Sequence, residues 1–267
     1  MRKTFLVAVV LMVELLWIFC DSAPSDEPEL RNVINYQKQC VFRLRFEDGR
    51  YTGTGFVINT LGNMVTCAHV VDSSRDNSGK YVDALTAENY VKLELKSGKT
   101  FRDMITFDVS VDTVIPTLDL ALLSLNLSKP RYKKNVNLSL PVDRPLFVRF
   151  ADSDSLWEGQ ELFACAYIDD GFTVSKPVIA RGVLSTIRDR CHDPRLNNEV
   201  DILQLDLNIS KGNSGGPVFL PSNGRVVGII DWGIFRDSKW QTGYAVALSI
   251  NQIVEKLREL KIPVDFK

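Results

Sequence analysis

One serine of this chain stands among three glycines, in the hexapeptide Gly-Asn-Ser-Gly-Gly-Pro at residues 212–217. Glycine permits turns and close backbone approaches that residues with a Cβ atom resist, so this loop could expose Ser214 and orient backbone N–H groups beside it. A serine hydroxyl is a weak nucleophile until a neighbouring base takes its proton. The loop therefore predicts a histidine partner elsewhere in the chain.

The chain contains two histidines. His69 lies in the apolar stretch 65–71, where an imidazole needs a specific partner to offset its burial. His192 lies in a polar, charged segment that reads as a loop. A lone histidine is more often structural, but in combination with the Ser214 loop we interpret His69 as a general base and His192 as a surface residue.

A third residue must accept the imidazole N–H and hold its tautomer. Asp119 is the best candidate because leucines on both sides of it would keep it from water. Asp108 and Asp112 have less apolar surroundings. Taken alone, an aspartate that caps a turn before a strand would be the more common role for Asp119. With a serine and a histidine available, we predict that it orients the imidazole.

The order of these residues separates two classes of hydrolase. Gly-x-Ser-x-Gly also describes the nucleophile elbow of α/β-hydrolases, but those enzymes place the histidine after the serine. Here both histidines precede Ser214. The order His69, Asp119, Ser214 is that of the chymotrypsin class.

Short runs of β-branched and aromatic residues, separated by glycine, asparagine and aspartate, surround these residues and indicate an all-β fold. The expected strands are 41–46, 55–59, 64–66, 91–95, 106–111 and 120–125, then 162–166, 178–184, 202–207 and 226–230. A polar segment at 128–137 divides them into two units, and Asn223-Gly224 has the composition of a hairpin turn. Apolar residues at helical spacing between 250 and 260 predict a closing helix, capped by Ser249 or Asn251.

Four motifs in order resemble trypsin-like serine proteases of the HtrA/DegP type. They are Gly-Thr-Gly-Phe-Val-Ile at 53–58, Thr-Cys-Ala-His-Val-Val at 66–71, Leu-Asp-Leu-Ala-Leu-Leu at 118–123 and the serine hexapeptide. The match runs from about Cys40 to Leu260. The resemblance implies two six-stranded antiparallel β-barrels of the chymotrypsin-like kind, with the triad between them and a C-terminal α-helix.

On this basis we expect a signal peptide at 1–22, an N-terminal extension at 23–39, a first barrel at 40–130 with His69 and Asp119, a second barrel at 131–248 with Ser214, and the helix and tail at 249–267. The implied activity is that of a serine endopeptidase that forms an acyl-enzyme on polypeptide substrates. The backbone N–H groups of Gly212 and Ser214 are expected to form the oxyanion hole.

Two segments are expected to bind substrate. Asp231-Trp232-Gly233 resembles the segment that pairs with extended substrate backbone in trypsin-like enzymes, although Trp232 could equally pack on the core. Asn208, six residues before Ser214, occupies the position that the resemblance places near the base of the primary pocket. The preferred substrate side chain stays open.

The chain also departs from its relatives. HtrA-type proteases usually carry a PDZ domain after the helix, whereas this sequence stops at Lys267, so PDZ-dependent regulation is not expected and a homotrimer is only weakly implied. Asn213 replaces the aspartate that pairs with a newly cleaved N-terminal ammonium in digestive relatives. Without that ion pair or an activation site, no zymogen cleavage is expected. Val70 replaces a cysteine, so the disulfide beside the active site should be absent.

The N-terminus predicts export. Basic residues at 2–3, an apolar run at 5–19 and small residues at 20–22 suit a signal peptide cleaved near Ser22, with an uncleaved anchor as the weaker interpretation. We therefore expect a secreted protein or one of the secretory-pathway lumen. Cys40, Cys67, Cys165 and Cys191 would then allow three full disulfide pairings, which stay open, and Cys67 is expected to be buried in its apolar stretch. Glycosylation sequons occur at Asn126, Asn137 and Asn208.

Charge restricts the partners. Lys and Arg total 32 against 33 Asp and Glu, with no long basic stripe, so nucleic acid is not an expected partner. No metal or cofactor is expected, and no membrane span is expected once the signal is removed. The alternative function is a latent or inactive protease-like binding or chaperone protein, because a collapsed loop around Gly212 would not be visible in the sequence.

Overall fold

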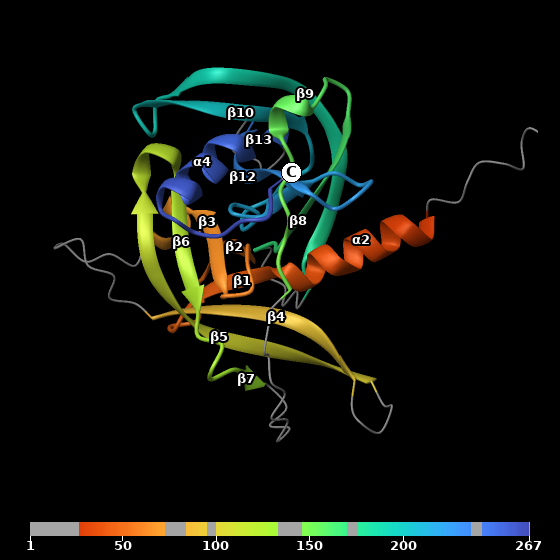
Figure 1. The fold of residues 1–267 in the computed structure, drawn as a ribbon, viewed down its shortest axis with the longest axis vertical. Helices are drawn as coiled ribbons and strands as arrows, with labels where there is room; N and C mark the ends of the chain where they lie inside the picture. Colours follow the sequence, from red (N-terminus) through yellow and green to blue (C-terminus); the bar gives the residue numbers. More distant parts are fainter. Residues whose placement is uncertain are drawn as a thin grey trace, which may run out of the picture.

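The computed structural model describes residues 27–72, 84–94, 100–132, 146–169, 176–235 and 242–266 (Figure 1). The predicted signal peptide at 1–22 and the sequon at Asn137 lie outside the described residues. No helix within the described ranges is long and apolar enough to cross a membrane.

The first half of the chain forms a ring of six antiparallel strands. The ring contains β1 (Val41–Phe46), β2 (Tyr51–Val57), β3 (Asn63–Cys67), β4 (Leu85–Glu94), β5 (Thr100–Ile115) and β6 (Leu120–Leu125). A short seventh strand, β7 (Arg131–Tyr132), pairs with β5 outside the ring. The order is β4-β1-β2-β3-β6-β5-β7, and β4 also pairs with β5, which closes the ring of six. The long strands β4 and β5 run side by side in Figure 1.

The second half forms a closed barrel of six antiparallel strands. They are β8 (Glu161–Ala166), β9 (Val178–Asp193), β10 (Asn198–Asp206), β11 (Pro217–Phe219), β12 (Val226–Phe235) and β13 (Thr242–Ser249). Their order around the barrel is β10-β13-β12-β11-β8-β9. Together with the C-terminal helix, the two barrels confirm the predicted chymotrypsin-like fold class.

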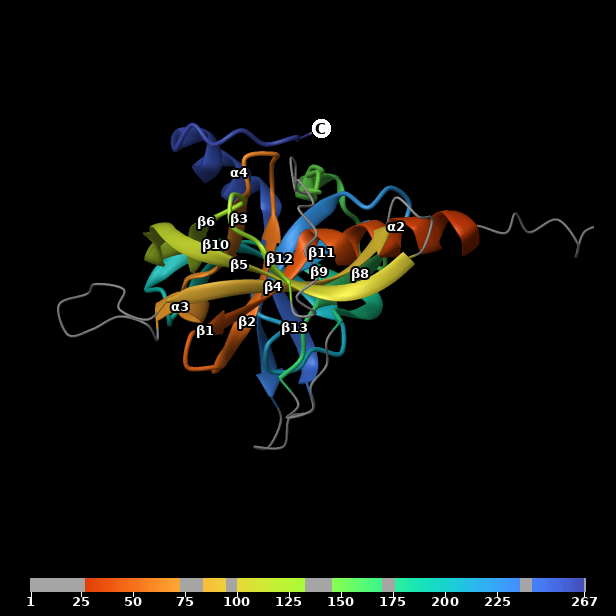
Figure 2. The same cartoon turned by 90° about the horizontal axis from the view of Figure 1, so that it is seen from below.

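Among the described residues, three α-helices accompany the barrels: α2 (Glu27–Cys40), α3 (Ala68–Asp72) and α4 (Ile250–Glu259). Single 3₁₀ turns, η1 (Pro116–Leu118) and η2 (Ser153–Ser155), precede β6 and β8. Helix α4 packs on β12 and β13, whereas α2 packs on β1 and β4, so the two helices lie well apart in both views (Figures 1 and 2). Ser249 is the N-cap residue of α4, but its hydroxyl pairs with Ser153 Oγ at 2.7 Å and does not cap the helix.

Buried apolar side chains form two clusters. The larger cluster fills the first barrel and continues through Phe163, Tyr167 and Phe219 of the second half to the buried face of α4. The smaller cluster lies inside the second barrel. The barrels therefore share one continuous apolar contact, which fixes the position of the loops between them.

Several elements differ from the sequence prediction. Residues 27–40 form a helix within the region expected as an N-terminal extension, and 242–249 form a strand that is not among the predicted strands. Arg131–Tyr132 pair with β5, so the first sheet continues past the predicted boundary at 130. Strands β9 and β10 are longer than predicted because their outer parts pair with each other while exposing polar side chains, which hides the apolar pattern of a strand.

The four cysteines of the described residues are free thiols, so none of the three pairings is formed. Cys67 is fully buried, as its apolar surroundings predict. Asn126 and Asn208 are both exposed.

Candidate active site

His69 and Asp119 form a hydrogen-bonded pair. His69 lies on the first turn of α3, directly after β3 ends at Cys67. Its Nδ1 atom lies 2.6 Å from Asp119 Oδ2, and its backbone N–H donates to Asp119 Oδ1 at 2.9 Å. With Nδ1–H donated to a carboxylate, Nε2 is left as a proton acceptor. The His69 side chain is 43% exposed and that of Asp119 only 5%, so the base is accessible and its partner is not.

The backbone holds Asp119 in a left-handed conformation, with φ of 45°, at the end of η1. Aspartate tolerates this region better than most residues that carry a Cβ atom. The Asp119 N–H donates to Pro116 O at 3.2 Å, and the Asp119 carbonyl accepts from Ala68 N–H at 2.8 Å. Two backbone bonds and two side-chain bonds therefore fix the carboxylate against the histidine.

The other two candidate aspartates lie away from His69. The Asp108 carboxylate pairs with Arg131 at 2.7 Å, and the Asp112 carboxylate accepts from the Ser124 hydroxyl at 2.5 Å. Both are exposed. The second histidine, His192, is exposed on β9.

The charges of the pair support each other. Burial lowers the pKa of His69, but the hydrogen bond and negative charge of Asp119 outweigh it, and the pKa is raised above 6.5. Burial acts to raise the pKa of Asp119, but the hydrogen bond and charge of His69 keep it below 3.8. Asp119 is thus ionised at neutral pH and favours a protonated His69.

Ser214 lies in the tight loop that precedes β11. Its hydroxyl donates to the Asp231 backbone carbonyl at 2.9 Å, and its own carbonyl accepts from Thr54 N–H at 2.9 Å. Gly215 has φ of +85°, and a Cβ atom there would lie 2.0 Å from Thr54 O. Glycine is therefore required at 215 both by the backbone conformation and by the close approach of the first barrel.

Asn213 ties the loop to itself and to the second barrel. Its Oδ1 accepts from Ser210 N–H, and its Nδ2 donates to Tyr167 O, both at 2.7 Å. The side chain is buried. Asn213 thus holds the loop through two neutral hydrogen bonds. The sequence predicts that this residue forms no ion pair with an N-terminal ammonium.

The orientation of the peptide bond between Lys211 and Gly212 is fixed by a hydrogen bond. The Lys211 carbonyl accepts from Asp169 N–H at 2.8 Å, and the Gly212 carbonyl accepts from the Thr54 hydroxyl at 2.8 Å. A planar trans peptide points its C=O and N–H in opposite directions. The Gly212 N–H therefore faces away from Asp169.

One cavity of about 290 Å³ joins these groups. Predicted residues that line it are His69, Gly212, Ser214, Asp231, Trp232 and Gly233; Arg195, Ile209, Ser210 and Lys211 complete its wall. Asn208 is not part of this wall. Leu207 and Ile209 on either side of it are buried, so the alternation of the chain turns the Asn208 side chain outward.

Asp231 lies at a β-bulge in β12. Ile230 pairs with Ala247 and Trp232 with Val246, which leaves Asp231 as the extra residue. A bulge re-aims side chains, and the Asp231 carboxylate is buried toward His69. Within the described part of the chain, residues 231–235 pair only with β13, so the other edge of this segment is open.

The sequence prediction missed Arg195, which lies in the turn between β9 and β10. Its guanidinium contacts the Asp231 carboxylate at 2.6 Å and the Asp193 carboxylate at 2.6 Å. Asp193-Pro194 is a recognisable turn signal. The pairing of Arg195 with an acid 36 positions away is not visible in the sequence.

Four potential metal ligands lie together at this site. Atoms of Cys67, His69, Asp119 and Asp231 all lie within 4.8 Å of one another. A metal would need the Cys67 thiolate, but burial raises the pKa of this thiol well above its usual range, and Sγ contacts Ile230 O at 3.3 Å. Because Arg195 also occupies the carboxylate of Asp231, the group does not fit a metal centre.

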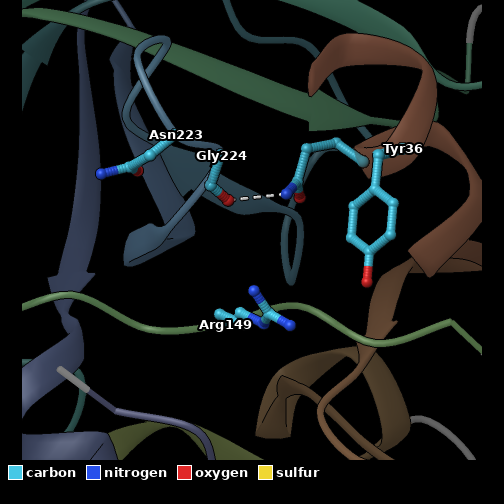
Figure 3. A pocket seen from close by; sticks show the side chains of 5 residues that line it. Tyr36, Arg149, Asn223 and Gly224 are labelled. Carbon is cyan, nitrogen blue, oxygen red and sulfur yellow. Dashed lines mark hydrogen bonds between the residues drawn. The ribbon is translucent and has the colours of Figure 1, made fainter. Parts of the chain in front are cut away.

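A second cavity of about 230 Å³ lies between α2 and the β11–β12 turn (Figure 3). Tyr36, Gln37, Arg149, Asn223 and Gly224 line it. The Gln37 side chain is buried, and its Nε2 donates to Gly224 O at 2.6 Å, so it joins the helix to the second barrel. Its Oε1 has no hydrogen-bond partner among the described residues. This cavity contains none of the predicted catalytic residues.

Known proteins match this chain over most of its length. The serine protease HTRA1A of Danio rerio is 31% identical over 179 residues, which cover 67% of this chain and 29% of that protein. A probable periplasmic serine endoprotease, DegP-like, of Brucella suis biovar 1 is 28% identical over 208 residues, which cover 77% of this chain and 32% of that protein. The chain thus spans about a third of the length of these relatives.

Solved structures agree on the fold. Deg5 is 20% identical with a TM-score of 0.59, and the match covers 88% of this chain and 95% of that one. The HtrA-type protease AlgW, solved with a decapeptide, is 18% identical with a TM-score of 0.61 over 86% of this chain and 67% of that one. The family model described as a trypsin-like peptidase domain matches residues 53–229. Since that match covers more than half of the sequence and the relatives are HtrA and DegP proteases, this chain belongs to the trypsin-like peptidase family.

Proposed function

We propose that this protein is a serine endopeptidase that cleaves unfolded or flexible polypeptides through an acyl-enzyme. The observation that carries the proposal is that Ser214 and His69 line one cavity, and that His69 is hydrogen-bonded to the buried Asp119 behind it. The pair comes from the first barrel and the serine from the second, so the cavity lies where the barrels meet.

In the proposed reaction, the Ser214 hydroxyl turns about χ1 from the Asp231 carbonyl to His69 Nε2. Ser214 Oγ attacks the peptide carbonyl while His69 takes the proton and then returns it to the leaving amine. Asp119 holds the imidazole tautomer and stabilises the imidazolium. Water then attacks the acyl-enzyme with His69 again as the base.

The backbone N–H groups of Gly212 and Ser214 are the proposed oxyanion donors. The loss of one such donor can cost roughly 100-fold to 1000-fold in rate. The bonds of Thr54 and Asn213 to the loop support a loop that is ordered without an N-terminal ammonium. We therefore propose that no zymogen cleavage is needed.

The open edge of residues 231–235 supports binding of an extended polypeptide as an added strand. Such binding needs a substrate segment free of its own secondary structure. The signal-like N-terminus and relatives that include a protein named as periplasmic support export of this chain.

The proposal is tested by digesting unfolded casein with purified protein beside Ser214→Ala and His69→Gln, with products read by mass spectrometry. His192→Gln is the matched control because this exposed residue lies outside the site. We expect cleavage by the wild type and the control and none by the two site variants. Equal cleavage by wild type and Ser214→Ala would overturn the proposal.

One observation favours a second candidate, a latent protease-like binding protein: the Ser214 hydroxyl is bonded to Asp231 O and not to His69. A fluorophosphonate probe distinguishes the two, since it labels only an activated serine. No labelling, together with suppressed aggregation of an unfolded client, would favour the binding protein.

A further inference from the structure

Two carboxylates face the imidazole of His69. Besides Asp119, Asp231 places its Oδ1 atom 3.8 Å from His69 Nδ1, and its side chain is 0% exposed. Asp231 also lies within hydrogen-bonding reach of Asp119. Burial and this neighbouring acid raise the pKa of Asp231 to about 7. Two buried carboxylates this close compete for one proton unless a cation compensates one of them.

Arg195 supplies that cation. Its Nη2 lies 2.6 Å from Asp231 Oδ2 and its Nη1 lies 3.3 Å from Asp231 Oδ1, which is the two-pronged geometry that suits guanidinium and carboxylate. The hydrogen bonds and charges of Asp231 and Asp193 raise the pKa of Arg195 against its burial. The guanidinium therefore stays charged.

The Arg195 side chain is itself held in place. Asp193 accepts from Arg195 Nη2 at 2.6 Å and from the Arg195 backbone N–H at 2.8 Å. The Trp232 ring centroid lies 5.1 Å from the guanidinium carbon, which suits a cation–π contact. Together with the bonds to Asp231, these contacts define the position of the charge.

The same hairpin also contacts the loop that carries Asp119. Asn198, at the start of β10, donates from Nδ2 to the Thr117 carbonyl at 2.9 Å. Thr117 belongs to η1, two residues before Asp119. The turn at 193–198 therefore contacts the Asp231 side of the site and the Asp119 side.

The groups that face Asp231 come from four elements. Cys67 at the end of β3 is a buried neutral thiol; His69 on α3 and Asp119 after η1 form the catalytic pair. Arg195 comes from the β9–β10 turn. Among the described residues that face Asp231, Arg195 is the permanent cation.

We propose that Arg195 is a positioning residue of the peptidase: it neutralises the buried Asp231 carboxylate, so that Asp119 keeps its charge and its hydrogen bond for His69. The inference rests on the proposed function. Without Arg195, the pKa of Asp231 rises further, so the two acids share a proton up to a higher pH and Asp119 is a weaker partner for the imidazolium. Without Asp231, the charge of Arg195 opposes the imidazolium directly.

The experiment compares Arg195→Met, Asp231→Asn and the double variant. Arg190→Met is the matched control, because Arg190 lies on the same hairpin and pairs with Glu199 in an exposed ion pair. The measurements are kcat and KM against pH on a peptide substrate, with thermal unfolding to confirm that each variant folds. The control should retain the wild-type profile.

We expect Arg195→Met to lose roughly 10-fold to 100-fold in kcat at pH 7, a range typical of a misplaced catalytic group, and to recover as the pH rises. Adding Asp231→Asn should restore at least part of kcat at pH 7, because the second acid is then gone. A wild-type pH profile in Arg195→Met would overturn the proposal. A folded double variant whose kcat at pH 7 is no higher than that of Arg195→Met would also overturn the proposal.

The pKa of His69 can be measured by NMR without any substrate cleavage. This measurement tests the role of Arg195 independently of the proposed peptidase function. The chain has two histidines, so His192→Gln assigns the His69 resonance in an NMR titration. We expect the His69 pKa to be lowest in Asp231→Asn, where Arg195 is unbalanced, and higher in the double variant. Equal values would overturn the charge compensation even if the protein cleaves casein, and the expected order would support it even if the wild type is inactive.

Discussion

The chemistry of single residues at this site is decided by a competition between burial and charge. Burial alone would discharge both His69 and Asp119. Their 2.6 Å hydrogen bond reverses this, because each partner stabilises the charged form of the other. Asp119 therefore stays ionised at neutral pH, and His69 takes up a proton more readily than a free imidazole.

The raised pKa of His69 predicts opposite pH trends for activity and stability. Activity needs neutral His69, so kcat/KM should rise with pH through a midpoint above 6.5. The stability that protonated His69 contributes is complete below pH 6.5 and is lost as the pH rises through the same folded-state pKa. Rate profiles and urea unfolding between pH 5 and 9 measure the two trends.

Asp119→Asn supplies the check on this assignment. It should lower the His69 pKa and reduce kcat at neutral pH by up to roughly 10,000-fold, the loss known for the equivalent change in a serine protease. An acid limb that stays above pH 6.5 in this variant would contradict the role of Asp119.

The sequence was sufficient to predict the pairing of His69 with Asp119, because apolar neighbours mark a buried acid among three candidates. It was not sufficient for Arg195 and Asp231. Their contact depends on a bulge in β12 and on the reach of a hairpin, and neither leaves a local pattern. The position of Asn208 was not predictable for a related reason. Its distance from Ser214 along the sequence does not say which way its side chain points, and it does not line the cavity.

At the scale of elements, the serine loop is held by neutral hydrogen bonds from three directions. Thr54 reaches it from β2, Tyr167 from the end of β8, and Asp169 from the following segment. Thr54 bonds the carbonyl of Gly212, Asp169 bonds that of Lys211, and Asn213 contributes the loop's side-chain bond to Tyr167. The loop is thus ordered by contacts already present in the folded chain.

Asn213→Ala should therefore loosen the oxyanion loop. We expect the rate of fluorophosphonate labelling to fall roughly 100-fold, as for a lost oxyanion donor. Two buried hydrogen bonds are removed, so the free energy of unfolding should fall by about 1 to 3 kcal/mol.

Asn223→Ala is the control for Asn213→Ala, since Asn223 is exposed and accepts one turn bond, from Arg225 N–H at 2.9 Å. It should change neither labelling nor stability by a comparable amount. Unchanged labelling in a folded Asn213→Ala protein would show that the loop is ordered by other contacts.

Elements with strong apolar patterns were predictable, and β1 and β6 have the predicted bounds. Helix α2 was not, because its sequence is largely polar and it is joined to the barrel by polar contacts such as that of Gln37. Strand β13 was not predicted, because no turn signal precedes it. In each case tertiary contacts outside the segment decide its structure.

The whole molecule depends on contacts that pass between the barrels. The Thr54 hydroxyl, buried in the first barrel, donates to Gly212 O at 2.8 Å and accepts from Tyr167 N–H at 3.0 Å. The larger apolar cluster also runs across this boundary. Stability and the geometry of the site therefore share the same interface.

Thr54→Val keeps the shape of the side chain but leaves a buried N–H and a buried carbonyl without their partner. We expect the free energy of unfolding to fall by about 2 to 4 kcal/mol, with one cooperative transition, as measured by circular dichroism in urea. Thr86→Val is the control: its hydroxyl makes one bond, to Arg45 O at 3.2 Å within the first barrel, and should cost about 1 kcal/mol. Equal costs would mean that the contact between the barrels carries no special stability.

The contact of Arg195 with Asp231 also constrains how this sequence can change over evolutionary time. The two residues are far apart in the chain, yet a change at either one alone leaves a buried charge without its counterion. A lineage that replaces one of them passes through a weakened intermediate unless the other changes as well. The two positions are therefore expected to be gained and lost together, as a single inherited unit within the trypsin-like peptidases.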